Sequence, residues 1–112
     1  MDDDLCRDIM KRILNLKDAD IQIYRELVKV RSARVSEISK MVGKDRTTVQ
    51  RSLNRLVKAG LCSKERKVLD GGGYFYIYVM KKPEDIRSIL EDCLERWYAK
   101  LKERIKIENA LL

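Results

Sequence analysis

The side chains best suited to chemical recognition lie in residues 46–61, a segment with arginine, lysine, threonine, asparagine and glutamine but no aspartate or glutamate. A helix turns by about 100° per residue, so a helix here places Val49, Leu53 and Leu56 on one face and polar side chains on the other. Arginine suits guanine, asparagine and glutamine suit adenine, and threonine suits the thymine methyl group. The segment therefore indicates a surface that reads base edges of duplex DNA.

The two halves of this polar face have different expected roles. The N-terminal half of a recognition helix enters the major groove, so its side chains are the candidates for base contacts. These are Thr47, Thr48, Gln50 and Arg51. Side chains at the start of the helix, farther along it and on the strand that follows are expected to contact phosphates or flanking DNA. These are Lys44, Arg46, Asn54, Arg55, Lys58, Lys64, Arg66 and Lys67.

The basic charge of the chain is concentrated around this segment. The 112 residues contain 25 Lys and Arg against 18 Asp and Glu, a net charge of +7. Residues 29–69 carry twelve basic and three acidic side chains, whereas residues 1–28 have a net charge of −2 and residues 70–112 a net charge of zero. Such a block is the electrostatic footprint of a nucleic-acid-binding surface. The alternative is an ordinary solvated face, although such a face would mix glutamate with lysine.

Enzyme and metal-binding functions are disfavoured by what the chain lacks. There is no histidine, which removes the commonest general base and most zinc sites. Cys6, Cys62 and Cys93 are far apart and lie beside leucines, which is typical of reduced core thiols; a redox-sensing cysteine is the less favoured alternative. With no phosphate-binding loop or paired carboxylates, we expect no catalysis, no cofactor and no metal.

Length and hydropathy predict one small intracellular domain. Charged residues make up 38% of the chain and hydrophobic residues 45%. No apolar run approaches the roughly 18 residues of a membrane span. The chain starts Met-Asp-Asp-Asp, which is acidic where a signal peptide is basic. We therefore expect a cytoplasmic protein with no membrane partner.

A few residues that break regular structure delimit the elements that must hold the polar segment. Gly43, Gly60, Pro83 and the glycines at 71–73 separate runs of periodic apolar residues. Helices are predicted over residues 3–15, 19–30, 36–42, 46–59 and 84–110, with Asp18, Ser36 and Asp45 as N-caps. Strands are predicted over residues 61–69 and 74–80, with a short extended contact at Val35.

The order of these elements predicts the fold class. Two short helices with a glycine turn between them match the helix-turn-helix pattern, and a hairpin directly after the second helix is a wing. We expect a mainly α protein with a small β-hairpin wing. A winged helix-turn-helix domain over residues 1–82, including the N-terminal helix, is followed by a C-terminal dimerisation helix over residues 83–112.

The last predicted helix is too long to pack only on its own domain. At 1.5 Å per residue, residues 84–110 span about 40 Å. An apolar stripe along it needs a partner, and two-fold dimers are the commonest oligomers. We expect a homodimer; the alternative is a monomer in which the first and last helices cover each other. The expected interface residues are Leu5, Ile9, Ile13, Ile86, Leu90, Cys93, Trp97, Leu101 and Ile105.

Four segments of the chain resemble archaeal winged helix-turn-helix transcriptional regulators of the TrmB-like and MarR-like kind, in particular a small single-domain subgroup. The segments are residues 44–53, 59–61, 72–76 and 96–100, with Leu56 between the first two. The resemblance implies a dimeric DNA-binding regulator. TrmB itself has a C-terminal sugar-binding domain to which nothing in this chain corresponds, so the resemblance assigns no ligand site and the effector is unknown.

Three functional hypotheses follow from these observations. The leading one is a sequence-specific, double-stranded DNA-binding transcriptional regulator that acts as a homodimer. The second is a winged-helix protein-interaction module in a transcription or replication assembly, where the basic face meets an acidic partner. The third is a nonspecific, chromatin-type DNA binder. The acid-free face of residues 46–61 favours DNA over a protein partner.

Overall fold

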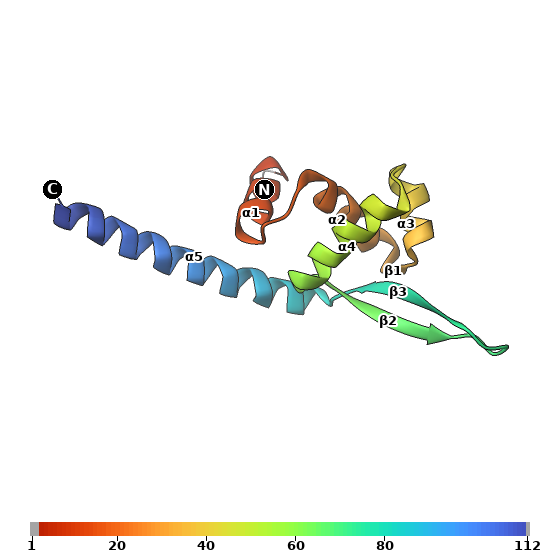
Figure 1. Cartoon of the computed structure of the whole chain (residues 1–112). Helices are drawn as coiled ribbons and strands as arrows, with labels where there is room; N and C mark the ends of the chain where they lie inside the picture. Colours follow the sequence, from red (N-terminus) through yellow and green to blue (C-terminus); the bar gives the residue numbers. More distant parts are fainter. Residues whose placement is uncertain (1–2, 112) are drawn as a thin grey trace.

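The computed structural model describes the backbone of residues 3–111 and the side chains of residues 8–82 and 84–107. Helices and a small sheet follow one another in the order that the sequence predicted (Figure 1). The elements are α1 (Asp3–Ile13), α2 (Asp18–Val30), β1 (Ser32–Ala33), α3 (Val35–Val42), α4 (Arg46–Lys58), β2 (Cys62–Val68), β3 (Tyr74–Met80) and α5 (Pro83–Leu111). The mainly helical winged-helix architecture is confirmed.

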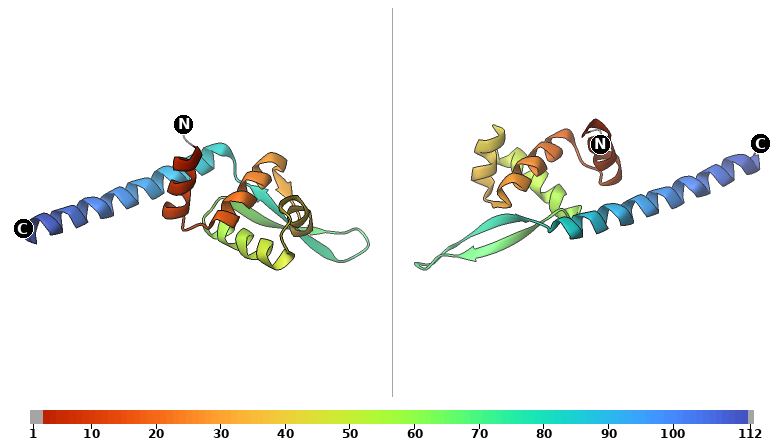
Figure 2. Two further views of the ribbon diagram at one scale, coloured as in Figure 1. Left: turned by 90° about the horizontal axis from the view of Figure 1, so that it is seen from above. Right: turned by 180° about the vertical axis from the view of Figure 1, so that it is seen from behind.

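The core lies where α2, α3 and α4 meet above the base of the sheet (Figures 1 and 2). Each helix contributes apolar side chains at helical spacing, such as Leu27, Ile38 and Leu53, which are completely buried. Tyr78 of β3 closes the core from below. Burial of a large apolar side chain contributes roughly 1.5–3 kcal/mol, so these contacts set the position of α4.

The sheet has three strands rather than the two of a simple hairpin. Its order is β1-β3-β2, with all pairs antiparallel and with Cys62 opposite Met80 and Val68 opposite Tyr74. The extended contact predicted at Val35 is wrong by two residues, because α3 already begins there. The strand β1 pairs instead at Ser32–Ala33, where the Met80 N–H donates to the Arg31 carbonyl at 2.9 Å.

The turn before α4 follows the sequence prediction. Gly43 ends α3 in the left-handed conformation, with φ of 67°, which a side chain at this position would disfavour. The Asp45 carboxylate then accepts from the Thr48 N–H at 2.7 Å and caps α4. The Ser39 hydroxyl donates to the Lys44 carbonyl and closes the turn.

The predicted N-caps of α2 and α3 are wrong. Asp18 is already helical, and the cap position belongs to Lys17, whose N–H donates to the Asp20 carboxylate at 2.9 Å. Likewise α3 is capped at Arg34 instead of Ser36, and the Arg34 N–H donates to Glu37 at 2.9 Å. In both helices the carboxylate at the third helical position accepts a hydrogen bond from the N–H of the cap residue, as in a capping box.

The helix α5 leaves the body and extends away from it (Figures 1 and 2). Its first turns are anchored by Ile86, which packs against the core, and by Ile89, whose Cδ1 would lie 3.2 Å from a Cβ added at Gly60. The molecule measures 69 × 26 × 25 Å, with a radius of gyration of 17.5 Å against about 13 Å for a compact domain of this size. No helix within the described residues is long and apolar enough to cross a membrane.

Candidate nucleic-acid interface

The outer face of α4 is polar, exposed and free of acid. Val49, Leu53 and Leu56 point into the core, as the helical periodicity predicted. The side chains of Thr47, Arg51, Asn54 and Lys58 are exposed on the opposite side, with Thr48 half-buried at the first turn and Lys44 and Arg46 at its start. The first turn contains no acidic residue, and the Asp45 carboxylate that precedes it is engaged as the N-cap through the Thr48 N–H.

Gln50 is half-buried and is tied to the wing. Its amide nitrogen donates to the Tyr78 hydroxyl at 2.6 Å and to the Asn54 side-chain oxygen at 3.0 Å. An amide has two N–H donors, so both are used and the carbonyl oxygen remains as the acceptor for an incoming donor. The sequence placed Gln50 beside the recognition face but did not indicate this link between α4 and β3.

Arg55 does not lie on the exposed face where the sequence placed it. Its guanidinium makes two hydrogen bonds to the Asp20 carboxylate of α2, at 2.7 and 2.9 Å, and its side chain is only 32% exposed. The same helical turn also packs against α2, where the buried Asp20 carboxylate binds the guanidinium. That Arg55 contacts DNA stays a prediction. Arg55 holds α4 in place.

Asp20 is the centre of this connection. Burial alone raises the pKa of Asp20, but hydrogen bonds from Arg55, Ser52 and the Lys17 N–H, together with the guanidinium charge, leave its pKa below the usual value. The ionised carboxylate therefore accepts hydrogen bonds from the cap residue of α2 and from Arg55 of α4 at the same time. A bidentate Arg–carboxylate pair has a defined geometry, so it also sets the rotation of α4 on α2.

On the wing, two basic side chains lie over tyrosine rings. The register puts Lys64 and Arg66 on one face of the hairpin with the alternate tyrosines of β3. The Lys64 ammonium is 4.3 Å from the ring centre of Tyr76, and the Arg66 guanidinium is 4.2 Å from that of Tyr74. Such cation–π contacts hold long side chains in defined positions. Lys67 is instead paired with Glu65 at 3.5 Å.

A groove joins the wing to the start of α4. It has a volume of about 240 Å³ and is lined by basic, aromatic and polar side chains without any acid. Arg46 of α4, Lys64 of β2 and Arg34 from the loop before α3 supply its positive charge. Arg34 lies 3.6 Å from the ring centre of Phe75 and was missed by the sequence analysis. Its position within the basic block was the available signal.

The remaining candidates lie apart from this groove. Lys58 is twelve residues after Arg46, about 18 Å along the helix, and lines a separate hollow with Leu14 and Asn15. Lys67 lies toward the tip of the wing. Of the residues predicted from the sequence, the structure therefore brings Arg46, Gln50 and Lys64 together in the groove. The other predicted residues are spread along α4, the turn before it and β2.

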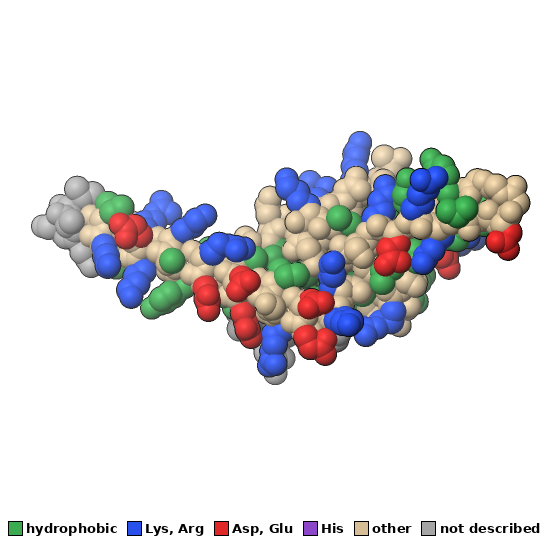
Figure 3. All heavy atoms as spheres, turned by 90° about the horizontal axis from the view of Figure 1, so that it is seen from below, with side chains coloured by type: hydrophobic (Ala, Val, Ile, Leu, Met, Phe, Trp, Pro, Cys, Tyr) green, Lys and Arg blue, Asp and Glu red, His purple; other side chains and the backbone are tan. Residues whose placement is uncertain are grey.

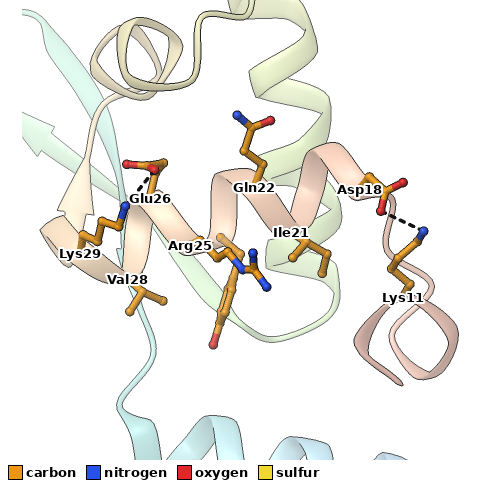
Figure 4. A pocket seen from close by; sticks show the side chains of 9 residues that line it. Lys11, Asp18, Ile21, Gln22, Arg25, Glu26, Val28 and Lys29 are labelled. Atoms are coloured by element: carbon orange, nitrogen blue, oxygen red, sulfur yellow. Dashed lines mark hydrogen bonds and ion pairs between the residues drawn. The ribbon is translucent and has the colours of Figure 1, made fainter. Parts of the chain in front are cut away.

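Another hollow follows the outer side of α2 and has a different character. It measures about 830 Å³ and contains the ion pairs Lys11–Asp18 at 2.9 Å and Lys29–Glu26 at 3.2 Å (Figure 4). Both signs of charge are present, so this surface lacks the single sign that marks the groove between α4 and the wing.

The predicted dimer residues divide into a covered and an exposed group. Ile9, Ile13, Ile86, Leu90 and Cys93 are half-buried, whereas Trp97, Leu101 and Ile105 are 46%, 38% and 56% exposed. The side chain of Leu5 lies outside the described residues. Where α1 passes α5, a hollow of about 300 Å³ is lined by Ile9, Ile13, Leu94 and Trp97. Contact with α1 therefore leaves the stripe on α5 largely uncovered.

The cysteines with described side chains are free thiols. Cys62 is buried at the start of β2, and this burial raises its pKa to about 11. It is the inert core thiol that the sequence predicted. Cys93 is half-buried on α5 and accepts from the Arg96 guanidinium at 3.2 Å.

Comparison with known proteins agrees with this geometry. A family model described as the sugar-specific transcriptional regulator TrmB matches residues 10–84, which run from α1 to the start of α5. An uncharacterized protein of Methanocaldococcus jannaschii is 38% identical over 96 residues, which cover 86% of this chain and 79% of that protein. The chain belongs to the TrmB family. The resemblance read from the sequence is thereby confirmed.

Solved structures extend the similarity of this TrmB-family protein over α5. A possible transcriptional regulator from Methanosarcina mazei Go1 superposes with a TM-score of 0.81 at 30% identity, over 90% of this chain and 86% of that one. A MarR protein from Peptoclostridium difficile superposes with a TM-score of 0.55 at 19% identity, over 90% of this chain and 63% of that one. The second similarity shows the shared winged-helix fold alone.

Proposed function

We propose that this TrmB-family protein is a transcriptional regulator that binds double-stranded DNA in a sequence-specific manner as a homodimer. The observation that carries the proposal is the outer face of α4, where no acidic residue occurs between positions 46 and 61. Such a face has no acidic side chain that would repel a polyanion, and its basic side chains attract one. Family membership supports transcriptional regulation.

In the proposed complex, the first half of α4 enters the major groove. Thr47, Thr48 and Arg51 contact base edges, and Arg51 has the length and geometry for a bidentate contact with guanine. Gln50 accepts from a base through its carbonyl oxygen, because its amide hydrogens are held by Tyr78 and Asn54. The donors on cytosine and adenine in the major groove suit this oxygen.

The DNA backbone is bound on either side of this helix. Lys44 lies in the turn before α4, Arg46 and Lys58 lie at the two ends of α4, and Lys64 and Arg66 lie along the wing. The stacking of Lys64 and Arg66 on tyrosine rings supports a role in backbone binding, because a side chain that is already ordered loses less entropy when it contacts a phosphate. Contacts come from the strand flank, since the tip at residues 70–73 is Asp-Gly-Gly-Gly.

The homodimer in this proposal is supported by the exposed stripe on α5. Trp97, Leu101 and Ile105 remain substantially exposed, although monomeric proteins rarely present a contiguous row of large apolar side chains. A two-fold dimer would present two recognition helices to half-sites separated by one helical turn of DNA, about 34 Å, or a multiple of it.

The test compares binding to the DNA upstream of the protein's own gene with binding to random duplexes, over a series of salt concentrations. Specific regulation predicts at least about 10³-fold tighter binding to one upstream site at physiological salt. Equal affinity for all duplexes, with a steep salt dependence, would identify a nonspecific binder. An absence of binding to any duplex at low salt would leave the basic face to a protein partner.

A further inference from the structure

Six apolar residues of α5 form a stripe whose spacing reads the same in both directions along the helix; it includes Leu94 and leaves out Cys93 and Ile89, which lie at its edge. Its members follow one another at steps of four, four, three, four and four residues. They are Ile86, Leu90, Leu94, Trp97, Leu101 and Ile105. Two copies of such a stripe match residue for residue when the helices run in opposite directions, with the centre between residues 95 and 96.

The charges of α5 are divided at the same point. Residues 84–95 carry five acidic and one basic side chain, and residues 96–107 carry five basic and one acidic side chain. Figure 3 shows the acidic side chains where α5 leaves the body and mainly lysine and arginine around its free part. The helix dipole accounts for such a preference only in the first and last turns. Blocks of three turns each need another explanation.

We infer that α5 pairs with the α5 of a second copy of this chain in an antiparallel arrangement, with the two-fold axis between residues 95 and 96. This inference rests on the proposed homodimer and specifies its geometry. In the antiparallel arrangement, the block with a net charge of −4 faces the block with +4 twice. A parallel pair would set equal charges against each other over the whole interface.

The surface beside the first half of α5 supports this orientation. A groove of about 400 Å³ between α2 and α5 is lined mostly by apolar side chains, including Tyr24, Met80, Ile86 and Leu90. Val28 also lines it and points from α2 toward α5 (Figure 4). The groove lies beside the half of the stripe that is partly covered by its own body.

Antiparallel pairing fills the groove and covers the exposed half of the stripe in one step. The partner's Ile105 would arrive beside Ile86, and the partner's Leu101 beside Leu90. In the single chain Leu101 and Ile105 are 38% and 56% exposed. The two Trp97 side chains would lie near the axis, each beside Leu94 of the other copy, where central aromatic residues contribute most to an interface.

Disulfide cross-linking distinguishes the two orientations. The background variant carries Cys6→Ser and Cys93→Ser, and it keeps Cys62, which is buried with a raised pKa of about 11. Leu90→Cys and Leu101→Cys are then introduced singly and together. In an antiparallel dimer, residue 90 lies about 16 Å along the axis from residue 90 of the partner chain and next to the partner's residue 101. The same holds for residue 101, which lies next to the partner's residue 90. A disulfide requires Cα atoms within about 7 Å.

The expected result is that the chain with both cysteines forms covalent dimers on mild oxidation and that each single variant stays largely uncross-linked. Efficient cross-linking of the single variants would show a parallel pair and overturn the inference, while the homodimer would stand. A dimer by sedimentation in which no variant cross-links would overturn it as well. A wild-type chain that sediments as a monomer at micromolar concentration would reject both the homodimer and its geometry.

A second variant leaves the apolar stripe intact. Lys100→Glu combined with Lys102→Glu changes two exposed side chains and should weaken self-association several-fold at low salt, with recovery at high salt. In a parallel pair these residues would face their own copies, so replacing basic with acidic side chains would leave the repulsion unchanged. Unaltered self-association at low salt would therefore contradict the antiparallel arrangement.

Discussion

The helices α4 and α5 are both amphipathic, yet they expose opposite kinds of surface. α4 buries Val49, Leu53 and Leu56 completely and exposes a polar face without acid. α5 buries little, carries balanced charge and exposes Trp97, Leu101 and Ile105. The body of the protein supplies the apolar partner that α4 needs, whereas α5 extends beyond the body.

This difference indicates which partner each helix lacks in a single chain. A face whose only charges are positive has an unfavourable self-repulsion that a polyanion relieves, so α4 is suited to nucleic acid. An exposed apolar stripe has an unfavourable contact with water that another apolar surface relieves, so α5 is suited to protein. In the proposed function, α4 therefore serves recognition and α5 serves assembly.

The largest expected effect comes from removing the apolar stripe of α5. Trp97→Ala combined with Leu101→Ala should convert the dimer to a monomer, because two of the largest exposed apolar side chains are lost. Affinity for the specific site should then fall by at least about 10²-fold, since the two half-sites no longer act together. Sedimentation and DNA binding measure the two effects, and Ile107→Ala, outside the stripe, serves as the control. A double variant that remains dimeric would contradict the assignment.

The next largest effect is expected where α4 is attached to α2. Asp20→Asn leaves Arg55 without its carboxylate and should lower the free energy of unfolding at pH 7 by about 3 kcal/mol or somewhat less, because the Arg55 side chain is a third exposed. Chemical denaturation measures this loss. Asp18→Asn, at an exposed carboxylate of the same helix, is the control.

The same pair predicts a pH dependence. The pKa of Asp20 is below its usual value in the folded state, so the unfolded chain binds the proton first as the pH falls. The stabilisation is therefore complete at neutral pH and is lost progressively below about pH 4. The difference between wild type and Asp20→Asn should shrink over that range. A constant difference down to pH 2 would show that the carboxylate contributes through packing instead of charge.

Base reading by α4 can be separated from backbone binding by the wing. Arg51→Ala should cost about 1–3 kcal/mol at the specific site and much less on random DNA, because a base contact is lost. Lys64→Ala should weaken binding to both and lower the slope of log affinity against log salt by about one. Equal losses on specific and random DNA for Arg51→Ala would show that it contacts only phosphates.

The smallest effect is expected at the turn that positions α4. Gly43 has φ of 67° and open space around it, so Gly43→Val adds backbone strain without a clash. The expected loss of stability is about 1–2 kcal/mol. Gly71→Ala, which also meets open space but does not require a positive φ, is the matched control. Thermal melts of the two variants that coincide would contradict a strain effect at Gly43.

Much of the fold could be predicted from the sequence because local signals and global packing agree. Helical spacing of apolar residues located α4, and Asp45 and Gly43 defined its start and the turn before it. Glycines at 71–73 and the β-branched and aromatic residues after them located the wing. Short-range physics governs each of these features, so a single chain carries the information.

The contacts between distant segments could not be predicted in the same way. Arg55 and Asp20 are 35 residues apart, and Gln50 and Tyr78 are 28 residues apart. The helical spacing of Arg55 is compatible with the DNA-facing side and with the flank that meets α2. A buried carboxylate on another helix decided between them, because its charge requires a partner once it is removed from water.

By itself, the sequence determined the helices, the wing, the acid-free face of α4 and the mirrored stripe and charges of α5, since each depends on residue type and spacing along one element. Only the tertiary structure decided which members of the basic face are free. It paired Arg55 with Asp20 of α2, tied Gln50 to Tyr78 and stacked Lys64 on Tyr76. The physical reason is that hydrogen bonds and ion pairs between elements depend on how the elements dock, and periodicity within one element does not specify docking.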